Sequence, residues 1–181
     1  MLQLTAPQVG EWQKVFEEMD VDHSGTVSVR EWLHFCNLPY TRFNLEERIR
    51  KRKERYAAAE DDDDSMSFGQ WAWAVAVLCL WSSAELKRFV FSFIDTDGVM
   101  GVTPAAMKLA IRDLVQSAPG TPSADQIIRS AKKIELDQLG LVSVRSFMDF
   151  AAIHPSLYFP AVLVQQKFRG AVMGEKWWDR K

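Results

Sequence analysis

The chain has 181 residues, of which 48% are hydrophobic and 25% are charged, and its formal net charge is −2. This composition is typical of a folded globular protein and excludes a largely disordered one. Because the net charge is close to zero, no overall charge favours binding to nucleic acid or to an anionic membrane.

Targeting and redox signals are sparse. Two cysteines, Cys36 and Cys79, do not make a disulfide framework, and we interpret them as buried thiols of a reducing compartment. The longest apolar run, 71–81, is too short to span a bilayer. The first residues match neither a secretory signal nor a myristoylation site. We therefore expect a cytoplasmic protein, with cytoskeletal association as an option, and neither a transmembrane segment nor a lipid anchor.

The first predicted elements are two amphipathic helices that flank an acidic loop. Apolar residues recur at helical spacing before the loop, in 12–19, and after it, in 32–36. Ser28 and Glu31 form an S-x-x-E pattern, which predicts that the second helix begins with a capping box.

The loop between these helices, Asp20 to Glu31, has the spacing of a twelve-residue calcium loop. Carboxylate and hydroxyl side chains alternate in its first half, and Gly25 stands at position six, where the chain must turn sharply. Glu31 at position twelve is long enough to bind a cation with both oxygens. The predicted ligands are Asp20, Asp22, Ser24, the carbonyl of Thr26, Ser28 through a water molecule, and Glu31. The predicted ion is one Ca²⁺ per chain, with Mg²⁺ as an alternative at rest.

An apolar residue followed by Ser or Thr recurs along the chain, as Val27, Met66, Val102 and Val142. In the first loop this residue holds position eight, and the Ser or Thr after it is suited to cap the outgoing helix. Four such units predict four helix-loop-helix hands packed as two pairs. We expect Val27 to lie opposite Met66, and Val102 opposite Val142, through short strand contacts.

The ligand chemistry is not repeated in the other three loops. The second loop has Ala59 in the first ligand position and Gln70 in the last, although Asp61 and Asp63 remain. Position twelve is Ala106 in the third loop and Ser146 in the fourth. We therefore expect one metal site and three hands whose role is structural.

These motifs resemble the EF-hand superfamily, over the region from about Leu4 to about Ile153. The resemblance is to the four-hand type that includes calmodulin, calcineurin B-like proteins and neuronal calcium sensors. It implies an all-α fold of four EF-hand helix-loop-helix units in two paired lobes. The neuronal sensors usually carry a myristoylation site and an inactive first loop, whereas here the first loop is the intact one.

The predicted domains are an N-terminal pair of hands over 1–83, a C-terminal pair over 84–154, and a helical tail over 155–181. The tail has an apolar stripe, with polar residues that include Gln165 between its members, and it ends in Trp177 and Trp178. The stripe comprises Leu157, Ala161, Val164, Phe168 and Val172. We expect the tail to pack on a groove of its own chain, with docking to a partner as the alternative.

Two further segments have more than one interpretation. From Arg42 to Arg55 there are seven Arg and Lys residues against three Glu, which indicates either a solvated helix face or a docking face for an acidic partner. The tryptophan-rich segment 71–81 is mostly core, and in an open lobe the same apolar surface would hold a helix of a partner protein.

The sequence does not favour an enzyme, since it contains neither a phosphate-binding glycine loop nor a nucleophile motif. The leading hypothesis is a calcium-responsive binding or regulatory module for a partner protein. One alternative is a constitutive structural subunit of a cytoskeletal, flagellar or other assembly, with one static metal site. A calcineurin B-like regulatory subunit is a further alternative, implied by the resemblance alone.

Overall fold

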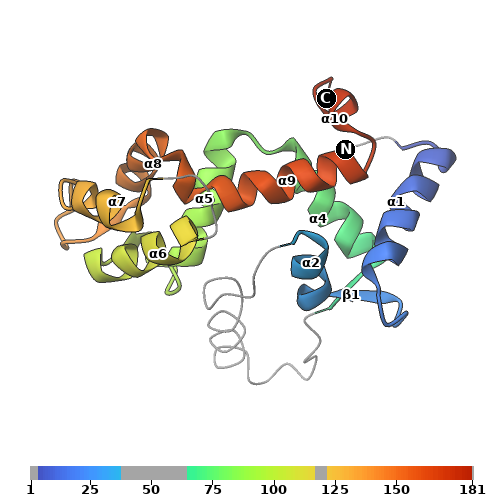
Figure 1. Ribbon diagram of the computed structural model, residues 1–181, viewed down its shortest axis with the longest axis horizontal. Coiled ribbons are helices and arrows are strands. Elements are labelled where there is room, and N and C mark those ends of the chain that lie inside the picture. The colour runs from blue at the N-terminus through green and yellow to red at the C-terminus, as the bar shows by residue number, and fades with distance from the viewer. Residues whose placement is uncertain (1–3, 38–64, 117–121, 181) are drawn as a thin grey trace. The chain divides into compact units, whose positions relative to one another are not determined.

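The computed structural model describes residues 4–37, 65–116 and 122–180, and within these the chain is mostly helical with four short strands (Figure 1). The described residues form two compact units. The first unit comprises 4–37, 65–81 and 163–180, and the second comprises 82–116 and 122–162. The predicted second loop and the basic segment 42–55 lie outside the described residues, apart from the end of that loop.

The described elements of each unit are helices joined by loops and short strands, and the helix expected before the second loop lies outside the described residues. The first unit contains α1 (Ala6–Met19), β1 (Thr26–Ser28), α2 (Val29–Phe35), β2 (Ser65–Ser67), α4 (Phe68–Leu80), most of α9 (Phe159–Ala171) and α10 (Glu175–Trp178). The second contains α5 (Ser83–Ile94), β3 (Gly101–Val102), α6 (Pro104–Gln116), α7 (Ala124–Ala131), β4 (Val142–Ser143), α8 (Val144–Ile153), the 3₁₀ turn η1 (Pro155–Leu157) and the start of α9.

The strands pair as the sequence predicts. β1 and β2 are antiparallel with Val27 opposite Met66, and β3 and β4 are antiparallel with Val102 opposite Val142. The three valines are buried and Met66 is half-buried. Each pairing therefore joins two of the predicted loops through the apolar residues at their position eight.

The helix after each strand begins at the predicted cap. The hydroxyls of Ser28, Thr103 and Ser143 each accept a hydrogen bond from the backbone N–H three residues on, at 3.1–3.3 Å. At the start of α4 the Gln70 side chain accepts from the backbone N–H of Ser67 at 2.9 Å. These bonds satisfy amides that a helix start otherwise leaves without partners.

The core of the first unit is aromatic. The Trp71 ring of α4 contacts Trp12 and Phe16 of α1, Phe68 of its own helix and Phe168 of α9, with centroid separations of 5.5–6.3 Å. Trp12 and Trp71 are at most 1% exposed. The helices of this unit are therefore joined through one cluster of rings.

The tail packs on its own chain, as expected. Phe168 and Val172 are fully buried and Trp178 is 2% exposed, with the Trp178 ring 6.0 Å from that of Trp12. Leu157 and Ala161, at the beginning of the predicted stripe, are buried within the second unit. The apolar stripe of the tail is thus shared between the two units.

Gln165, one of the polar residues between the members of the apolar stripe, has a buried side chain. Its amide donates to the backbone carbonyls of Leu78 at 2.7 Å and Trp81 at 2.8 Å. One turn further along α9, the Arg169 guanidinium donates to the carbonyl of Cys79 at 2.9 Å. These side chains satisfy carbonyls at the C-terminal end of α4, where helix carbonyls have no partner within the helix.

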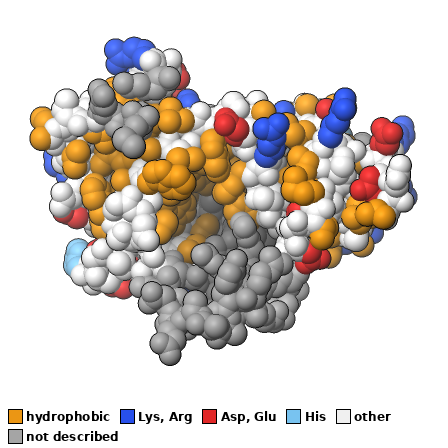
Figure 2. Space-filling model, turned by 180° about the vertical axis from the view of Figure 1, so that it is seen from behind, with side chains coloured by type: hydrophobic (Ala, Val, Ile, Leu, Met, Phe, Trp, Pro, Cys, Tyr) orange, Lys and Arg blue, Asp and Glu red, His pale blue; other side chains and the backbone are white. Residues whose placement is uncertain are grey.

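Hydrophobic side chains also reach the surface (Figure 2). Trp73 of α4, which the sequence places in the mostly buried segment 71–81, is 71% exposed. α4 is apolar on all sides, so periodicity could not distinguish its buried face from its exposed face. Among the described residues, no helix combines the length and the apolar character needed to cross a membrane.

Replacing Gln165 with Leu should destabilise the first unit. The change leaves the carbonyls of Leu78 and Trp81 without these donors, which is expected to cost about 1–3 kcal/mol. The neighbouring Gln166 is exposed, so Gln166→Leu is the matched control and should change stability by less than about 0.5 kcal/mol. Denaturant unfolding followed by circular dichroism measures both variants, and equal effects would contradict the role assigned to Gln165.

Candidate metal centre

The acidic loop lies between α1 and α2. α1 ends at Met19, and Asp20 follows as its C-terminal cap, with its backbone N–H donating to Phe16. Asp20 is only 6% exposed, whereas Asp22 is exposed and Glu31 is half-buried in the first turn of α2. The end of α1 thus positions the first carboxylate of the loop, and the start of α2 positions the last.

The structure brings three of the predicted ligands together. Carboxylate oxygens of Asp20, Asp22 and Glu31 lie within 4.8 Å of one another. Like charges at this separation repel by about 1 kcal/mol per pair even in water. The backbone donors of the loop must therefore offset the repulsion.

Asp20 accepts two of these backbone donors. One of its oxygens accepts from the backbone N–H of Ser24 at 2.9 Å, and the other from that of Gly25 at 2.8 Å. Gly25 has φ +82°, in the left-handed region where a side chain would be strained. The glycine at position six therefore lets the chain turn its N–H groups toward Asp20.

Glu31 closes the loop with both of its oxygens. Oε1 accepts from the backbone N–H of Val21 at 2.8 Å, and Oε2 accepts from the N–H and the hydroxyl of Ser28 at 2.8 and 2.7 Å. Partial desolvation acts to raise the pKa of Glu31, but the hydrogen bonds from Ser28 and Val21 outweigh it and lower the pKa. The carboxylate is thus held ionised at neutral pH.

The remaining predicted ligands lie beside these carboxylates. The hydroxyl oxygen of Ser24 lies 3.1 Å from the carbonyl oxygen of Thr26 and 3.3 Å from a carboxylate oxygen of Asp20, and its single proton is directed to one of them at a time. The hydrogen bonds from the side chain and backbone of Ser24 lower the pKa of Asp22. Ser28 engages Glu31 directly, so its predicted contact through a water molecule stays a prediction.

The donor atoms gathered here are oxygens only. Carboxylate, hydroxyl and carbonyl oxygens suit hard divalent cations such as Ca²⁺ and Mg²⁺, whereas sites for softer transition metals usually include imidazole or thiolate groups. The chemistry of the donor set therefore fits the predicted class of ion.

The third loop repeats the backbone of the first and keeps Asp95 and Asp97, but it lacks the full set of ligands. Asp95 accepts from the N–H groups four and five residues on, those of Val99 and Met100, at 3.1 and 2.9 Å. Met100 adopts φ +62° at the position that Gly25 holds in the first loop. Val99 is 62% exposed where Ser24 supplies a hydroxyl, and Ala106 stands in place of Glu31. This loop keeps the turn but not the donor set.

The fourth loop has a different internal arrangement. Asp137, at position three, accepts from the N–H groups of Leu139 and Leu141, both at 2.9 Å. Gly140 has φ +74° at position six, and Leu139 is 82% exposed in a ligand position. Among the described residues, Asp20, Asp22 and Glu31 form the one group of three His, Cys, Asp or Glu side chains close enough to hold a metal ion.

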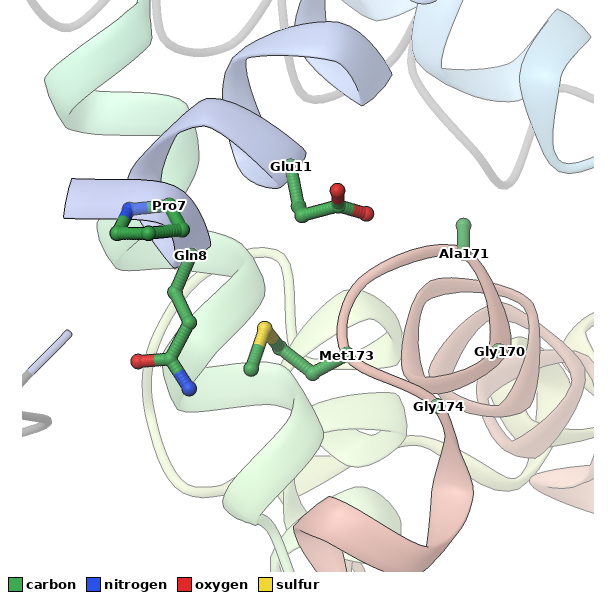
Figure 3. A pocket seen from close by; sticks show the side chains of 7 residues that line it. All are labelled: Pro7, Gln8, Glu11, Gly170, Ala171, Met173 and Gly174. Atoms are coloured by element: carbon green, nitrogen blue, oxygen red, sulfur yellow. The ribbon is translucent and has the colours of Figure 1, made fainter. Parts of the chain in front are cut away.

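A surface pocket of about 370 Å³ lies between α1 and the end of α9 (Figure 3). Its lining residues are Pro7, Gln8, Glu11, Gly170, Ala171, Met173 and Gly174. Gln8 accepts a hydrogen bond from the N–H of Thr5, and Glu11 pairs with Lys14 at 3.7 Å. Its polar side chains are therefore engaged in local contacts, and the pocket offers no arrangement of acid, base and nucleophile.

The cysteine thiols are poor nucleophiles. Burial raises the pKa of Cys36 and of Cys79 to about 12, so both thiols are protonated at neutral pH. Cys79 is buried, as the sequence predicts. Cys36 is only half-buried, so the same prediction is confirmed in part for that residue.

Comparison with known proteins found no family model that matches the chain and no curated protein with significant sequence similarity. The assignment of a function therefore depends on the residues of the acidic loop and their geometry.

One contributor to the centre could not be identified from residue types. The N–H of Val21 holds Glu31 in place, and this is a backbone group that carries no side-chain signal. The N–H of Val21, at loop position two, faces the carboxylate of Glu31, at position twelve, only once the loop has folded.

Replacing Met100 with Gly should stabilise the second unit. A left-handed non-glycine residue costs roughly 1–2 kcal/mol, and the added freedom of glycine in the unfolded chain offsets about 0.4–1 kcal/mol of this. The expected net gain is about 0.5–1 kcal/mol in thermal or denaturant unfolding. Val99→Gly is the control, because Val99 is outside the left-handed region and its replacement should be destabilising. A destabilised M100G variant would contradict the account of this loop.

Proposed function

We propose that the loop from Asp20 to Glu31 binds one Ca²⁺ and that the chain is built from four EF-hand units in two pairs. The observation that carries the proposal is the gathering of three carboxylates within 4.8 Å in a twelve-residue loop that also holds the Ser24 hydroxyl and the Thr26 carbonyl. The strand pairing of Val27 with Met66 and of Val102 with Val142 supports the paired hands.

The function that this geometry supports best is that of a calcium-responsive regulatory module for a partner protein in the cytoplasm. Glu31 is the last ligand of the loop and also lies in the first turn of α2. An ion that draws on Glu31 therefore acts directly on the position of α2. A shift of α2 on Ca²⁺ binding would in turn alter the surface that the protein offers to a partner.

A constitutive structural subunit is the second candidate, and a specific observation favours it. The third and fourth loops lack the position-twelve carboxylate, and apolar residues occupy ligand positions at Val99 and Leu139. The tail, moreover, already fills the first unit with Phe168 and Trp178. A single metal ion in such an assembly would stabilise the first unit without changing its conformation.

Calorimetry on the purified protein tests the metal site. The expected result is one Ca²⁺ per chain, with a Kd of about 10⁻⁷–10⁻⁵ M if the site is a sensor. Glu31→Gln should abolish measurable binding, because it removes the charge of the carboxylate that ends the loop.

The matched control is Glu85→Gln. Glu85 forms the same capping box with Ser82 at the start of α5, and its pKa is lowered by the hydrogen bonds from Ser82, but it lies outside the acidic loop. E85Q should bind Ca²⁺ like the unmodified protein. Ca²⁺ binding by the E31Q variant with unchanged affinity, or two or more tight Ca²⁺ sites per chain, would contradict the proposal.

The two functions differ in the effect of Ca²⁺ on exposed apolar surface. A responsive module should change the fluorescence of a dye that binds such surface when Ca²⁺ is added, and the E31Q variant should show no change. A structural subunit should bind Ca²⁺ with the dye signal constant. A constant signal at saturating Ca²⁺ would therefore reject the regulatory module in favour of the structural subunit.

A further inference from the structure

The acidic loop and the tail meet through α2. Trp32 follows Glu31 directly in the chain, and its ring lies 4.5 Å from the ring of Phe168 in α9, centroid to centroid. One turn further along α2, the Phe35 ring stacks on Phe168 at 5.4 Å. The ammonium of Lys167 also lies over the Phe35 ring, at 4.8 Å from its centroid. The last carboxylate of the loop is thus one residue away from the contact with the tail.

α2 cannot fix its own position. It has seven residues, and helices well under about 12 residues are marginal in water without tertiary packing. Its packing surface is made by Leu33, which is buried, and by Trp32 and Phe35, which meet Phe168. The hydrogen bonds from Val21 and Ser28 orient the Glu31 carboxylate locally, and the contact with Phe168 adds support for the helix that carries it.

The tail is held in place independently of α2. Gln165 and Arg169 donate to the carbonyls at the end of α4, and Trp178 packs on Trp12 of α1. Phe168 also meets Trp71 of α4 at 6.3 Å. These contacts make the tail a fixed support against which α2 rests.

We propose that the docked tail sets the cation affinity of the acidic loop, by holding α2 where Glu31 completes the group with Asp20 and Asp22. The three carboxylates are already gathered while the tail is docked, so docking and cation binding favour the same arrangement. The proposal rests on the proposed function, since it concerns the regulation of that same loop. Because coupling between two sites is reciprocal, the bound cation must also strengthen the docking of the tail.

The first test is a Ca²⁺ titration of Phe168→Ala by calorimetry. Loss of the support should weaken binding by roughly five- to 150-fold, the usual range of coupling between sites. Phe147→Ala is the matched control, because Phe147 is an equally buried phenylalanine in the core of the second unit. The Ca²⁺ affinity of this variant should equal that of the unmodified protein. Circular dichroism shows whether each variant is folded.

The second test needs no substitution. Amide hydrogen exchange of the full chain is measured with and without Ca²⁺, and exchange in residues 163–172 should slow when the ion binds. The amides of α6, in the second unit, are the internal control and should not change. This measurement decides the matter if F168A fails to fold.

The outcomes separate the two proposals. If the unmodified chain binds no Ca²⁺, the proposed function fails and this inference falls with it. If the chain binds Ca²⁺ but folded F168A binds it equally well, or the tail exchanges at the same rate with the ion, the coupling is overturned while the metal site stands.

Discussion

The first unit depends on the burial of Trp71. Its ring contacts α1, α4 and α9 at once, so a single side chain joins the first helix of the chain to the tail. Burying a tryptophan removes on the order of 200 Å² from water, which at about 25 cal/mol per Å² contributes about 5 kcal/mol. The indole nitrogens of Trp71 and Trp12 are buried and have no hydrogen-bond partner among the described residues, at a cost of roughly 1–3 kcal/mol each. The apolar burial outweighs this cost.

The acidic loop separates two roles that the sequence combines in the same residues. The backbone turn needs an aspartate that accepts amides four and five residues on, and Asp20 and Asp95 both provide it. The donor set needs in addition a carboxylate at position twelve, which Glu31 provides and Ala106 does not. The third loop shows that the turn forms without a full set of ligands. The turn therefore belongs to the fold, and the proposed metal site is an addition to it.

Local patterns predicted the caps and the strand register, because a residue at position eight and the hydroxyl after it act on their immediate neighbours. The exposure of Trp73 could not be predicted, since a helix that is apolar on every side has no periodicity that marks its buried face. The burial of Gln165 could not be predicted either, because its partner Leu78 lies 87 residues away in the chain. The sequence offered one signal of this burial. Gln165 lies four positions after Ala161 and three before Phe168, and therefore on the same helix face as the apolar stripe. The three carboxylates were predicted as a group, but the support of α2 by Phe168 required the folded tail.

A crystal structure of the full chain grown with Ca²⁺ tests the central claim most directly, through the anomalous scattering of the ion. The account predicts one peak among Asp20, Asp22 and Glu31, with both oxygens of Glu31 about 2.3–2.6 Å from it. It also predicts that Trp32 stays packed on Phe168 in the same crystal. An ion bound in the third or fourth loop, or an acidic loop without an ion at saturating Ca²⁺, would contradict the account.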